Sequence, residues 1–315
     1  MREPSAVVEL APAKVNLCLH VIGRRADGYH ELDSLVAFAD LGDSVRMEPA
    51  STGTFLQVTC DFEQGSESSA RSVVPAGTDN LAWRALAIGA RCVGGLPTGL
   101  TLSLTKRLPA GAGLGGGSSD AAAVMRALAR LGGGATPTGV LKQGASSLGA
   151  DVPMCLSPRP WRARGIGTLL EPIKLGRDLP AVLVWPARAV ATPAVFAART
   201  GDFGTPVPDA ALARLAGGDP IAALADLRND LTAAACAIEP AVSTALAAVA
   251  GIPGCRLARM SGSGSAVFGL FDDEAVAAAA ATALRRSHPA WWVRATVLRA
   301  GPVATGPGSD SRLSR

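Results

Sequence analysis

Pro109-Ala-Gly-Ala-Gly-Leu-Gly-Gly-Gly-Ser-Ser-Asp120 is the stretch that decides the fold, because five glycines and two serines stand directly before an alanine-rich run, Ala121 to Leu131. Glycine lets consecutive backbone N–H groups turn toward one concavity without clashes at Cβ, and a helix that follows adds the partial positive charge of its N-terminus. The stretch therefore predicts a cradle for phosphate, and a polyphosphate such as ATP would suit it.

The residues on both sides make this stretch part of a strand, loop and helix unit. Residues 99–105 alternate apolar and polar side chains, as a half-buried strand does. Val124, Leu128 and Leu131 share one face of the expected helix, and the glycines 132–134 end it. A flexible Gly-Ser linker is the alternative, since such a composition alone gives random coil. The flanking patterns argue against a linker.

Two other glycine-rich phosphate loops fit these residues less well. A Walker-type loop ends in Gly-Lys-Ser/Thr, and no lysine stands between Gly115 and Ser119. Gly111, Gly113 and Gly116 satisfy G-x-G-x-x-G, but no acidic residue lies about twenty residues further on, where a dinucleotide-binding fold holds its ribose. The Walker class is excluded, and the dinucleotide class is only weakly supported.

Composition indicates a globular protein of two domains, since 315 residues with 48% hydrophobic content can bury large cores. The net charge of +4 comes from 30 basic and 26 acidic residues without runs, so no nucleic-acid partner is expected. No apolar stretch reaches the roughly 18 residues of a membrane span, and no secretory segment opens the chain. Six cysteines without a C-x-x-C pair favour free thiols over a zinc site. We expect a soluble, cytoplasmic protein.

Strands and helices do not alternate strictly along the chain, which indicates an α+β architecture rather than a doubly wound sheet. The polar stretch 63–79 reads as a long surface loop, and Asp79 is expected to cap the helix after it. Strands are expected over 6–22 with a break at Pro12, and over 29–40, 43–62, 99–105, 158–164, 179–186, 255–260, 266–271 and 291–298. Helices are expected over 81–92, 121–131, 138–148, 192–199, 209–227, 230–249 and 274–286.

Lys14 and Asp151 are the residues that phosphate chemistry would need beside such a loop. Phosphoryl transfer requires a cradle for ATP, positive charge on the reacting oxygens, and a carboxylate that orients or deprotonates the acceptor hydroxyl. Alternation along residues 14–21 places Lys14 and Asn16 on one face of a strand, and Lys14 is one of only four lysines. Taken singly, Lys14 reads as a strand-face lysine that extends to water, and Asp151 reads equally as the cap of a short helix.

Three motifs resemble those of the GHMP small-molecule kinases, a family that includes galactokinase, homoserine kinase and mevalonate kinase. Residues 109–119 resemble the glycine-rich ATP motif of that family. Pro12-Ala-Lys-Val-Asn16 resembles its N-terminal motif, and Gly262-Ser-Gly-Ser-Ala-Val-Phe268 resembles its C-terminal glycine motif. The three motifs follow the family's order across almost the whole chain. Residues 12–19 and 24–32 most resemble the members that act on a cytidine-diphosphate-linked methylerythritol.

The resemblance implies a fold of two domains. The N-terminal domain would resemble domain 2 of ribosomal protein S5 and cover residues 1–178, with the ATP loop and the catalytic residues. A ferredoxin-like C-terminal domain would cover residues 179–300, and residues 301–315 are expected to form a disordered tail.

The resemblance also implies an activity and a set of site residues. The γ-phosphate of ATP, with Mg²⁺, would pass to the 2-hydroxyl of the cytidyl-linked methylerythritol, in the non-mevalonate route to isoprenoid precursors. Asp151 would be the general base and Lys14 the stabilising cation. The residues implied for ATP are Pro109, Ala110, Gly111, Ala112, Gly113, Leu114, Gly115, Gly116, Gly117, Ser118, Ser119, Asn80 and Lys106. Those implied for the acceptor are Asn16, Tyr29, His30, Thr192 and Phe196.

Several alternatives stay open at this level. A GHMP kinase for another small alcohol, such as mevalonate or homoserine, would share most of these residues, and so would a nucleotide-binding protein without enzymatic activity. Ser118 and Ser119 are the candidate magnesium ligands, whereas Asp120 has no assigned role. Val36 stands where relatives often carry phenylalanine, which leaves one side of the cytosine pocket undefined. The chain is expected to act as a monomer or weak homodimer.

Overall fold

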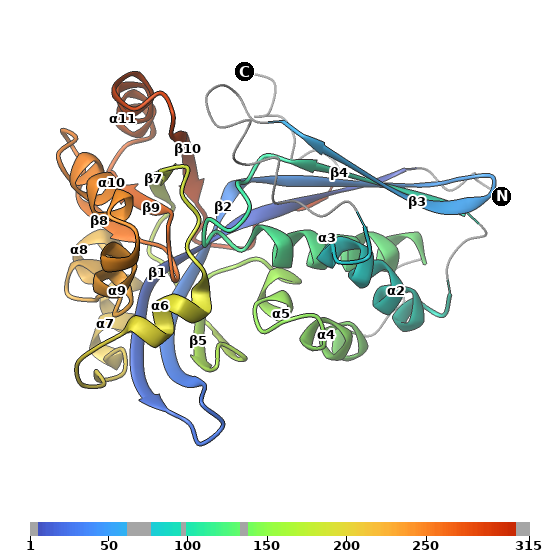
Figure 1. Ribbon diagram of the computed structural model, residues 1–315, viewed down its shortest axis with the longest axis horizontal. Coiled ribbons are helices and arrows are strands. Elements are labelled where there is room, and N and C mark those ends of the chain that lie inside the picture. The colour runs from blue at the N-terminus through green and yellow to red at the C-terminus, as the bar shows by residue number, and fades with distance from the viewer. Residues whose placement is uncertain (1–5, 62–76, 96–98, 133–137, 307–315) are drawn as a thin grey trace.

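Two long antiparallel strands run from one lobe of the molecule into the other in the computed structural model (Figure 1), which describes residues 6–61, 77–95, 99–132 and 138–306. They are β1 (Val7–Arg24) and β2 (His30–Pro49), paired along almost their whole length. Val15, Leu17 and Phe38 are fully buried in this hairpin. Because both lobes share it, residues on β1 and β2 can contact either half of the chain.

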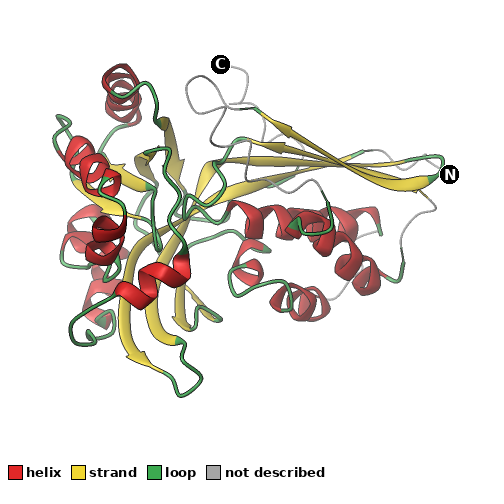
Figure 2. Cartoon of the chain, viewed as in Figure 1, coloured by secondary structure: helices red, strands yellow, loops and turns green. Residues whose placement is uncertain are grey.

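The N-terminal sheet is built on β2. Its second half pairs with β4, which pairs in parallel with β3, and its first half pairs with β5, which pairs with β6. Within the described residues, helices cover one face of this lobe (Figure 2). The strands are β3 (Gly53–Cys60), β4 (Gly99–Lys106), β5 (Trp161–Gly165) and β6 (Leu169–Pro172), and the helices are α2 (Leu81–Val93), α3 (Gly116–Leu131), α4 (Thr138–Ser146) and α5 (Val152–Cys155).

The C-terminal sheet has the antiparallel strand order β10-β7-β9-β8, and it meets the N-terminal sheet at the pair Leu298 and Ala39. In chain order, helices connect β7 to β8, and another helix connects β9 to β10. This is the ferredoxin-like arrangement predicted above. The strands are β7 (Leu179–Trp185), β8 (Leu257–Met260), β9 (Val267–Leu270) and β10 (Trp292–Leu298). The helices are α6 (Thr192–Ala198), α7 (Asp209–Leu215), α8 (Pro220–Ala225), α9 (Thr232–Ile238), α10 (Ala241–Ala250) and α11 (Glu274–Ser287).

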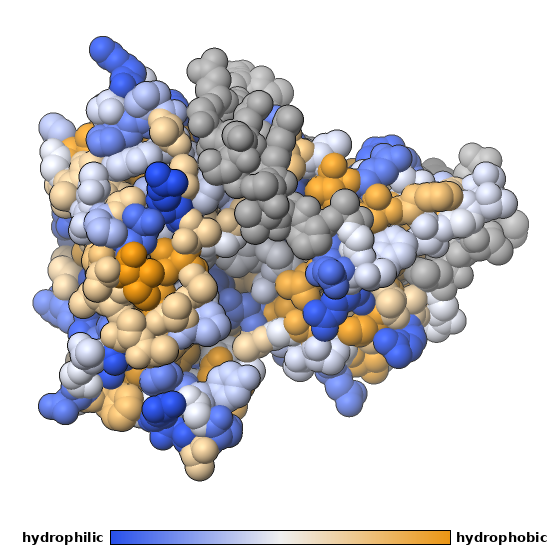
Figure 3. All heavy atoms as spheres, in the orientation of Figure 1, coloured by the Kyte–Doolittle hydropathy of each residue, from blue (hydrophilic) through white to orange (hydrophobic). Residues whose placement is uncertain are grey.

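Apolar side chains fill the space between each sheet and its helices. In the N-terminal lobe Phe38, Met47 and Leu102 of the sheet pack in one cluster with Val124 and Leu128 of α3. Each fully buried side chain of this size contributes about 1.5–3 kcal/mol to folding. No helix in the described part of the chain is long and apolar enough to cross a membrane. On the face in Figure 3, hydrophobic residues form small groups among hydrophilic ones in both lobes.

Several expected element boundaries were wrong. The expected strands 29–40 and 43–62 are instead β2, which continues without a break to Pro49, and β3. Strand β1 is not broken at Pro12, because a shift of register between Pro12 and Lys14 absorbs the proline within one continuous strand. Helix α3 begins at Gly116 rather than at Ala121. The expected helix 209–227 is two helices, α7 and α8, with Gly217 and Gly218 between them. The expected helix 230–249 is likewise split into α9 and α10, beside Pro240.

Two local details also differ from expectation. Asn80, not Asp79, caps α2, since its side chain accepts a hydrogen bond from the Ala82 N–H. The start of the expected disordered tail is ordered, because the Leu10 N–H donates to Thr305 O and the Val303 N–H donates to Pro158 O. Residues 307–315 and most of the loop expected at 63–79 lie outside the described residues. The domain boundary at 178/179 stays a prediction, with β7 beginning at the second of these residues.

His20, on β1, gives the fold a pH dependence that can be tested. Its buried ring accepts the Arg228 N–H at Nε2 over 3.4 Å and faces Thr205 O at Nδ1 over 3.0 Å, so the ring is neutral with its proton on Nδ1. Burial lowers the pKa of His20 in the folded state. The unfolded chain therefore binds a proton first as pH falls below about 6.5, and stability is lost from there downward.

We expect the free energy of unfolding to fall between pH 7.5 and pH 5.5 by up to about 1.4 kcal/mol per pH unit. Urea unfolding at several pH values measures it. His20→Gln should be less stable at pH 7.5 and show a flatter dependence over this range, whereas His288→Gln, at a half-buried ring stacked on Trp291, should keep the slope of the parent. An unchanged slope in His20→Gln would assign the effect to other groups.

Candidate active site

The glycine loop passes directly into helix α3. Gly115, at the N-cap, has the left-handed backbone (φ 68°) that favours glycine, and the first helical hydrogen bond runs from the Ser119 N–H to Gly115 O. The N–H groups of Gly116, Gly117 and Ser118 precede that bond, so the helix leaves them without a carbonyl partner. Together with the dipole of the 16-residue helix they form an anion site.

Three consecutive carbonyl oxygens of the loop are bound by the protein. Leu114 O accepts from the Lys14 N–H at 2.8 Å, Ala112 O accepts from the Ala266 N–H at 2.8 Å, and Gly113 O accepts from the Ser261 hydroxyl at 3.2 Å. A Cβ on Gly113 would lie only 2.6 Å from Gly264 O. These hydrogen bonds hold the loop against β1 and the C-terminal glycine motif. The three carbonyl oxygens therefore bind the protein rather than a ligand.

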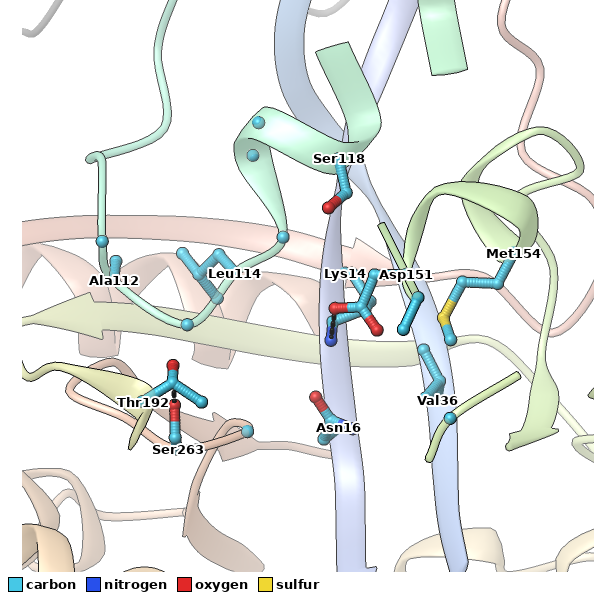
Figure 4. A pocket seen from close by; sticks show the side chains of 18 of the residues that line it. Lys14, Asn16, Val36, Ala112, Leu114, Ser118, Asp151, Met154, Thr192 and Ser263 are labelled. Atoms are coloured by element: carbon cyan, nitrogen blue, oxygen red, sulfur yellow. Dashed lines mark hydrogen bonds and ion pairs between the residues drawn. The ribbon is translucent and has the colours of Figure 1, made fainter. Parts of the chain in front are cut away.

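A cavity of about 660 Å³ is lined by the glycine loop and by residues from both lobes. Figure 4 shows part of its lining: Lys14 and Asn16 from β1, Ser118 from α3, Asp151 and Met154 from the start of α5, and Thr192 and Ser263 from the C-terminal half. Of the predicted site residues, the lining includes Lys14, Asp151, Asn16, Asn80, Lys106, Thr192, Phe196 and residues 109–118. A volume of this size matches a small-molecule site.

Lys14 and Asp151 form an ion pair in this cavity, with Nζ and Oδ2 2.6 Å apart. The Lys14 side chain is 9% exposed and that of Asp151 is 36% exposed. Asp151 stands at the N-cap of α5 but its side chain makes no capping hydrogen bond, and Lys14 does not extend into water. Lys14 is therefore not a strand-face lysine in water, and the Asp151 side chain does not cap a helix. The two residues are 137 positions apart in the sequence, and their side chains form one ion pair.

Lys106 is held beneath the loop by two carboxylates. Its Nζ donates to Asp120 at 2.6 Å and to Asp43, and all three side chains are at least 95% buried. Burial lowers the pKa of Lys106, but the charges of Asp120 and Asp43 more than offset this, so its pKa is raised. Burial raises the pKa of Asp120 well above its usual range, against the opposing effect of Lys106. The ammonium of Lys106 is thus bound by the protein itself.

Asp43 also holds the beginning of the loop. Its Oδ1 accepts from the N–H groups of Arg107 and Leu108, at 2.5 and 2.8 Å. A Cβ on Gly116 would lie 3.4 Å from Lys106 Nζ, so the helix start rests directly on this cluster. We call Lys106, Asp43 and Asp120 the buried triad. It joins β2, β4 and α3 under the phosphate cradle.

The residues predicted for the acceptor are only partly brought together. Thr192 and Phe196 line the cavity, and the Thr192 hydroxyl lies 2.8 Å from that of Ser263. His30 does not line it but stacks on Phe196, with ring centroids 5.0 Å apart. Burial lowers the pKa of His30, and the positive charges of Arg24 and Arg199 add to this. Tyr29, on the hairpin turn, is 63% exposed and lies away from the cavity lining.

Ser119 also lies outside the cavity, because its buried hydroxyl donates to Pro12 O at 2.7 Å. Of the two serines proposed for magnesium, Ser118 therefore remains. Within the described ranges no group of three or more His, Cys, Asp or Glu side chains could hold a metal.

Sequence reasoning missed several lining residues, notably Ser34, Met154 and Ser263. Ser263 belongs to the C-terminal glycine motif, so the motif itself signalled it. Ser34 pairs with Leu19 across the hairpin, and only that register places it behind Asn16. Met154 follows Asp151 in the same short helix, and no sequence pattern separates a methionine in a site from one in a core.

The fold and the loop-lined cavity define a small-molecule kinase of the GHMP class. The model of the GHMP kinases N terminal domain matches residues 80–158, and that of the GHMP kinases C terminal domain matches residues 211–290. A homoserine kinase structure from Cytophaga hutchinsonii aligns with a TM-score of 0.70 at 18% identity, over 94% of this chain and 96% of that one. That likeness concerns the fold alone.

Curated relatives define the family within this class. A 4-diphosphocytidyl-2-C-methyl-D-erythritol kinase from Paramagnetospirillum magneticum is 48% identical over 283 residues, which cover 90% of this chain and 95% of the relative. One from Cereibacter sphaeroides is 47% identical over 288 residues, with 90% and 96% covered. A crystal structure of 4-(cytidine 5'-diphospho)-2C-methyl-D-erythritol kinase has a TM-score of 0.77 at 40% identity, over 93% and 99% of the chains. The chain belongs to the 4-diphosphocytidyl-2-C-methyl-D-erythritol kinase family.

Proposed function

We propose that this chain transfers the γ-phosphate of ATP to the 2-hydroxyl of 4-diphosphocytidyl-2-C-methyl-D-erythritol, in the non-mevalonate route to isoprenoid precursors. The observation that supports this most is the ion pair of Lys14 and Asp151, which lies in one cavity with the phosphate loop. A nucleotide-binding protein without activity would need the loop but not this pair. We expect it to act in the cytoplasm as a monomer or weak homodimer, without a nucleic-acid partner.

The ATP phosphates would lie on the N–H groups of Gly116, Gly117 and Ser118, at the positive end of α3. The rest of the loop, Pro109 to Gly115, would surround them, and Asn80 would lie near the adenosine. Lys106 near the adenosine stays a prediction, because Lys106 lines the cavity while its ammonium is bound by Asp43 and Asp120 of the buried triad beneath the loop.

In the proposed reaction Asp151 accepts the proton of the attacking hydroxyl as the new bond from oxygen to the γ-phosphorus forms. The bond from that phosphorus to the bridging oxygen breaks, and ADP leaves. Lys14, whose ammonium lies 2.6 Å from Asp151, stabilises the negative charge that develops on the acceptor oxygen. The pair thus supplies a proton acceptor and a fixed positive charge at one point of the cavity.

Magnesium would enter with the nucleotide. Mg²⁺ keeps several waters and is usually bound through substrate phosphates and one or two protein oxygens. The Ser118 hydroxyl lies in the cavity and could be such a protein oxygen ligand. The Ser119 hydroxyl instead donates its hydrogen bond to Pro12 O. When bound, the ion would neutralise charge on the phosphates.

The acceptor would lie on the side of the cavity toward the C-terminal lobe. Asn16 and Thr192 offer polar groups there, and the stacked rings of Phe196 and His30 offer a flat apolar surface for a nucleobase. Tyr29 would contact the base from the outer rim, next to His30. Val36 lines the cavity with a smaller side chain than phenylalanine, which leaves more room beside the base.

Release of ADP with Mg-ATP tests the function directly. The acceptors are 4-diphosphocytidyl-2-C-methyl-D-erythritol, mevalonate and homoserine, each at the same concentration. Turnover on the first alone would confirm the proposal. Turnover on another alcohol would keep the kinase and reject the substrate, and binding of ATP without turnover on any of them would favour a binding protein.

His30→Ala should raise KM for the cytidyl acceptor about tenfold while KM for ATP changes less than twofold, because the imidazole forms part of the surface proposed for the base. Initial rates against each substrate measure both constants. His288→Ala, on the surface stack with Trp291, is the matched control. An equal rise in both KM values would indicate a general disturbance rather than a contact with the acceptor.

Gly115→Ala should lower kcat about ten- to hundredfold. The new Cβ would meet Lys14 Cβ at 2.9 Å, so either Lys14 or the helix start must move. Gly94→Ala is the control, since Gly94 has a similar left-handed backbone (φ 87°) but nothing within 4 Å of a new Cβ. The left-handed backbone should cost both variants about 1 kcal/mol of stability, and Gly115→Ala should lose more because of the contact with Lys14. Equal kcat values for Gly115→Ala and Gly94→Ala would show that the contact between residue 115 and Lys14 does not affect catalysis.

A further inference from the structure

Ser34, on β2, decides the orientation of the Asn16 side chain. The Ser34 hydroxyl donates to Cys18 O at 2.6 Å, and a carbonyl oxygen can only accept. With its one proton used, Ser34 Oγ can only accept from Asn16, which lies 2.8 Å away. The Asn16 group that faces it must therefore be the Nδ2 amide nitrogen, whichever way an amide might otherwise be turned.

This leaves the Asn16 oxygen without a partner. Asn16 is 5% exposed and lines the cavity, and its Oδ1 is buried with no hydrogen-bond partner in the described part of the chain. The backbone of Asn16 is held as well, since its N–H donates to the Ser261 hydroxyl, which donates to Gly113 O. A buried acceptor without a partner is unfavourable, so a ligand that donates a hydrogen bond to it binds more tightly than one that does not.

The space beside this oxygen is kept open by glycine. A Cβ on Gly262 would lie 3.3 Å from Asn16 Oδ1, and Gly262 itself lines the cavity. Asn16 and Lys14 both lie on β1, and in Figure 4 Asn16 lies next to the ion pair of Lys14 and Asp151. It lies on the side of that pair toward Thr192 and Ser263. The unpaired oxygen is thus near the point where the acceptor hydroxyl would react.

We propose that Ser34 is a positioning residue that holds Asn16 as an acceptor-only group, so that the alcohol substrate must present a hydroxyl proton to Asn16 Oδ1. The proposal rests on the proposed function for the nature of that substrate. A polyol with free hydroxyls beside the reacting one satisfies the site. An analogue with an ether or a carboxylate oxygen at that position leaves two acceptors facing each other and is rejected.

A double-mutant cycle tests this. Ser34→Ala should raise KM for the acceptor about tenfold with KM for ATP within twofold, because the freed amide can turn its nitrogen toward the substrate. Ser34→Thr, which keeps the hydroxyl, should restore the acceptor KM. In an Asn16→Ala background, Ser34→Ala should change the acceptor KM less than twofold, because Ser34 acts only through Asn16. Ser146→Ala, on the exposed surface of α4, is the control.

An equal effect of Ser34→Ala with and without Asn16 would overturn the proposal. A second readout needs no substrate: the Asn16 Nδ2 proton signals, identified by NMR from their loss in Asn16→Ala, should exchange with water at least tenfold faster in Ser34→Ala. Unchanged exchange would also overturn it. If the parent protein phosphorylates another alcohol, the cycle is run with that alcohol; if it phosphorylates none, the function fails and the exchange measurement alone decides the role of Ser34.

Discussion

Asp151→Asn is expected to lower kcat by about 10² to 10⁴, or roughly 3 to 5 kcal/mol, while ATP binds almost unchanged. An amide has the shape of the carboxylate but cannot accept the proton of the acceptor hydroxyl at neutral pH. It also removes the negative partner of Lys14, which lies 2.6 Å away. Because Asp151 is partly exposed, the ion pair itself contributes at most about 1 kcal/mol to stability, so the variant should remain folded.

Steady-state rates and ATP titration measure this prediction. Asp226→Asn is the matched control, since Asp226 also pairs with a basic side chain, that of Arg214, but on an exposed surface outside the cavity. Lys14→Ala should lower kcat by a similar factor, and a loss confined to KM would mean that Lys14 only binds substrate. Full turnover of Asp151→Asn would remove Asp151 from the mechanism.

Lys106→Met is expected to destabilise the protein by about 3–5 kcal/mol, because it leaves the buried carboxylates of Asp43 and Asp120 facing each other without a cation. Binding of ATP should weaken as well, since Asp43 holds the N–H groups that begin the loop. Urea unfolding measures the loss. Lys142→Met, on the exposed face of α4, should change stability by less than about 0.5 kcal/mol.

The pH dependence of this loss distinguishes charge from packing. Burial already raises the pKa of Asp120, and removal of Lys106 takes away the one neighbour that lowers it. The folded variant then binds protons more readily than the unfolded chain, so its stability falls as pH rises from about 4 upward. The difference from the parent should be smaller at pH 5 than at pH 8. A difference that is constant with pH would point to packing alone.

The local patterns predicted what depends on neighbours in sequence. Alternation from Lys14 onward correctly placed Lys14 and Asn16 on one face, and the order of strands and helices gave the α+β class. The start of α3 was wrong because glycine has a low helix propensity, whereas Gly116 is helical here since it packs on the buried triad. The breaks within 209–227 and 230–249 had local signals, in Gly217 and Pro240, that the longer periodic patterns obscured.

The roles of Lys106, Ser119 and Ser34 had no such local signal. Each depends on partners far away in the sequence: Lys106 on Asp43, and Ser119 on Pro12. For Ser34 the decisive partner is the Cys18 carbonyl across the hairpin. A residue type and its spacing indicate what a side chain could do, but hydrogen bonding to distant groups decides which of its atoms are free to do it.

The sequence by itself determined the class of chemistry in this protein. A run of glycines before a helix can turn successive N–H groups toward an anion wherever it lies in a fold, because that property belongs to the backbone of the run. Only the tertiary structure decided which charged groups meet there. Lys14 and Asp151 are 137 residues apart, and packing of α5 and β1 against α3 brings them together while Lys106 is enclosed below. Electrostatic interactions depend on distance and burial, and neither can be read from position along the chain.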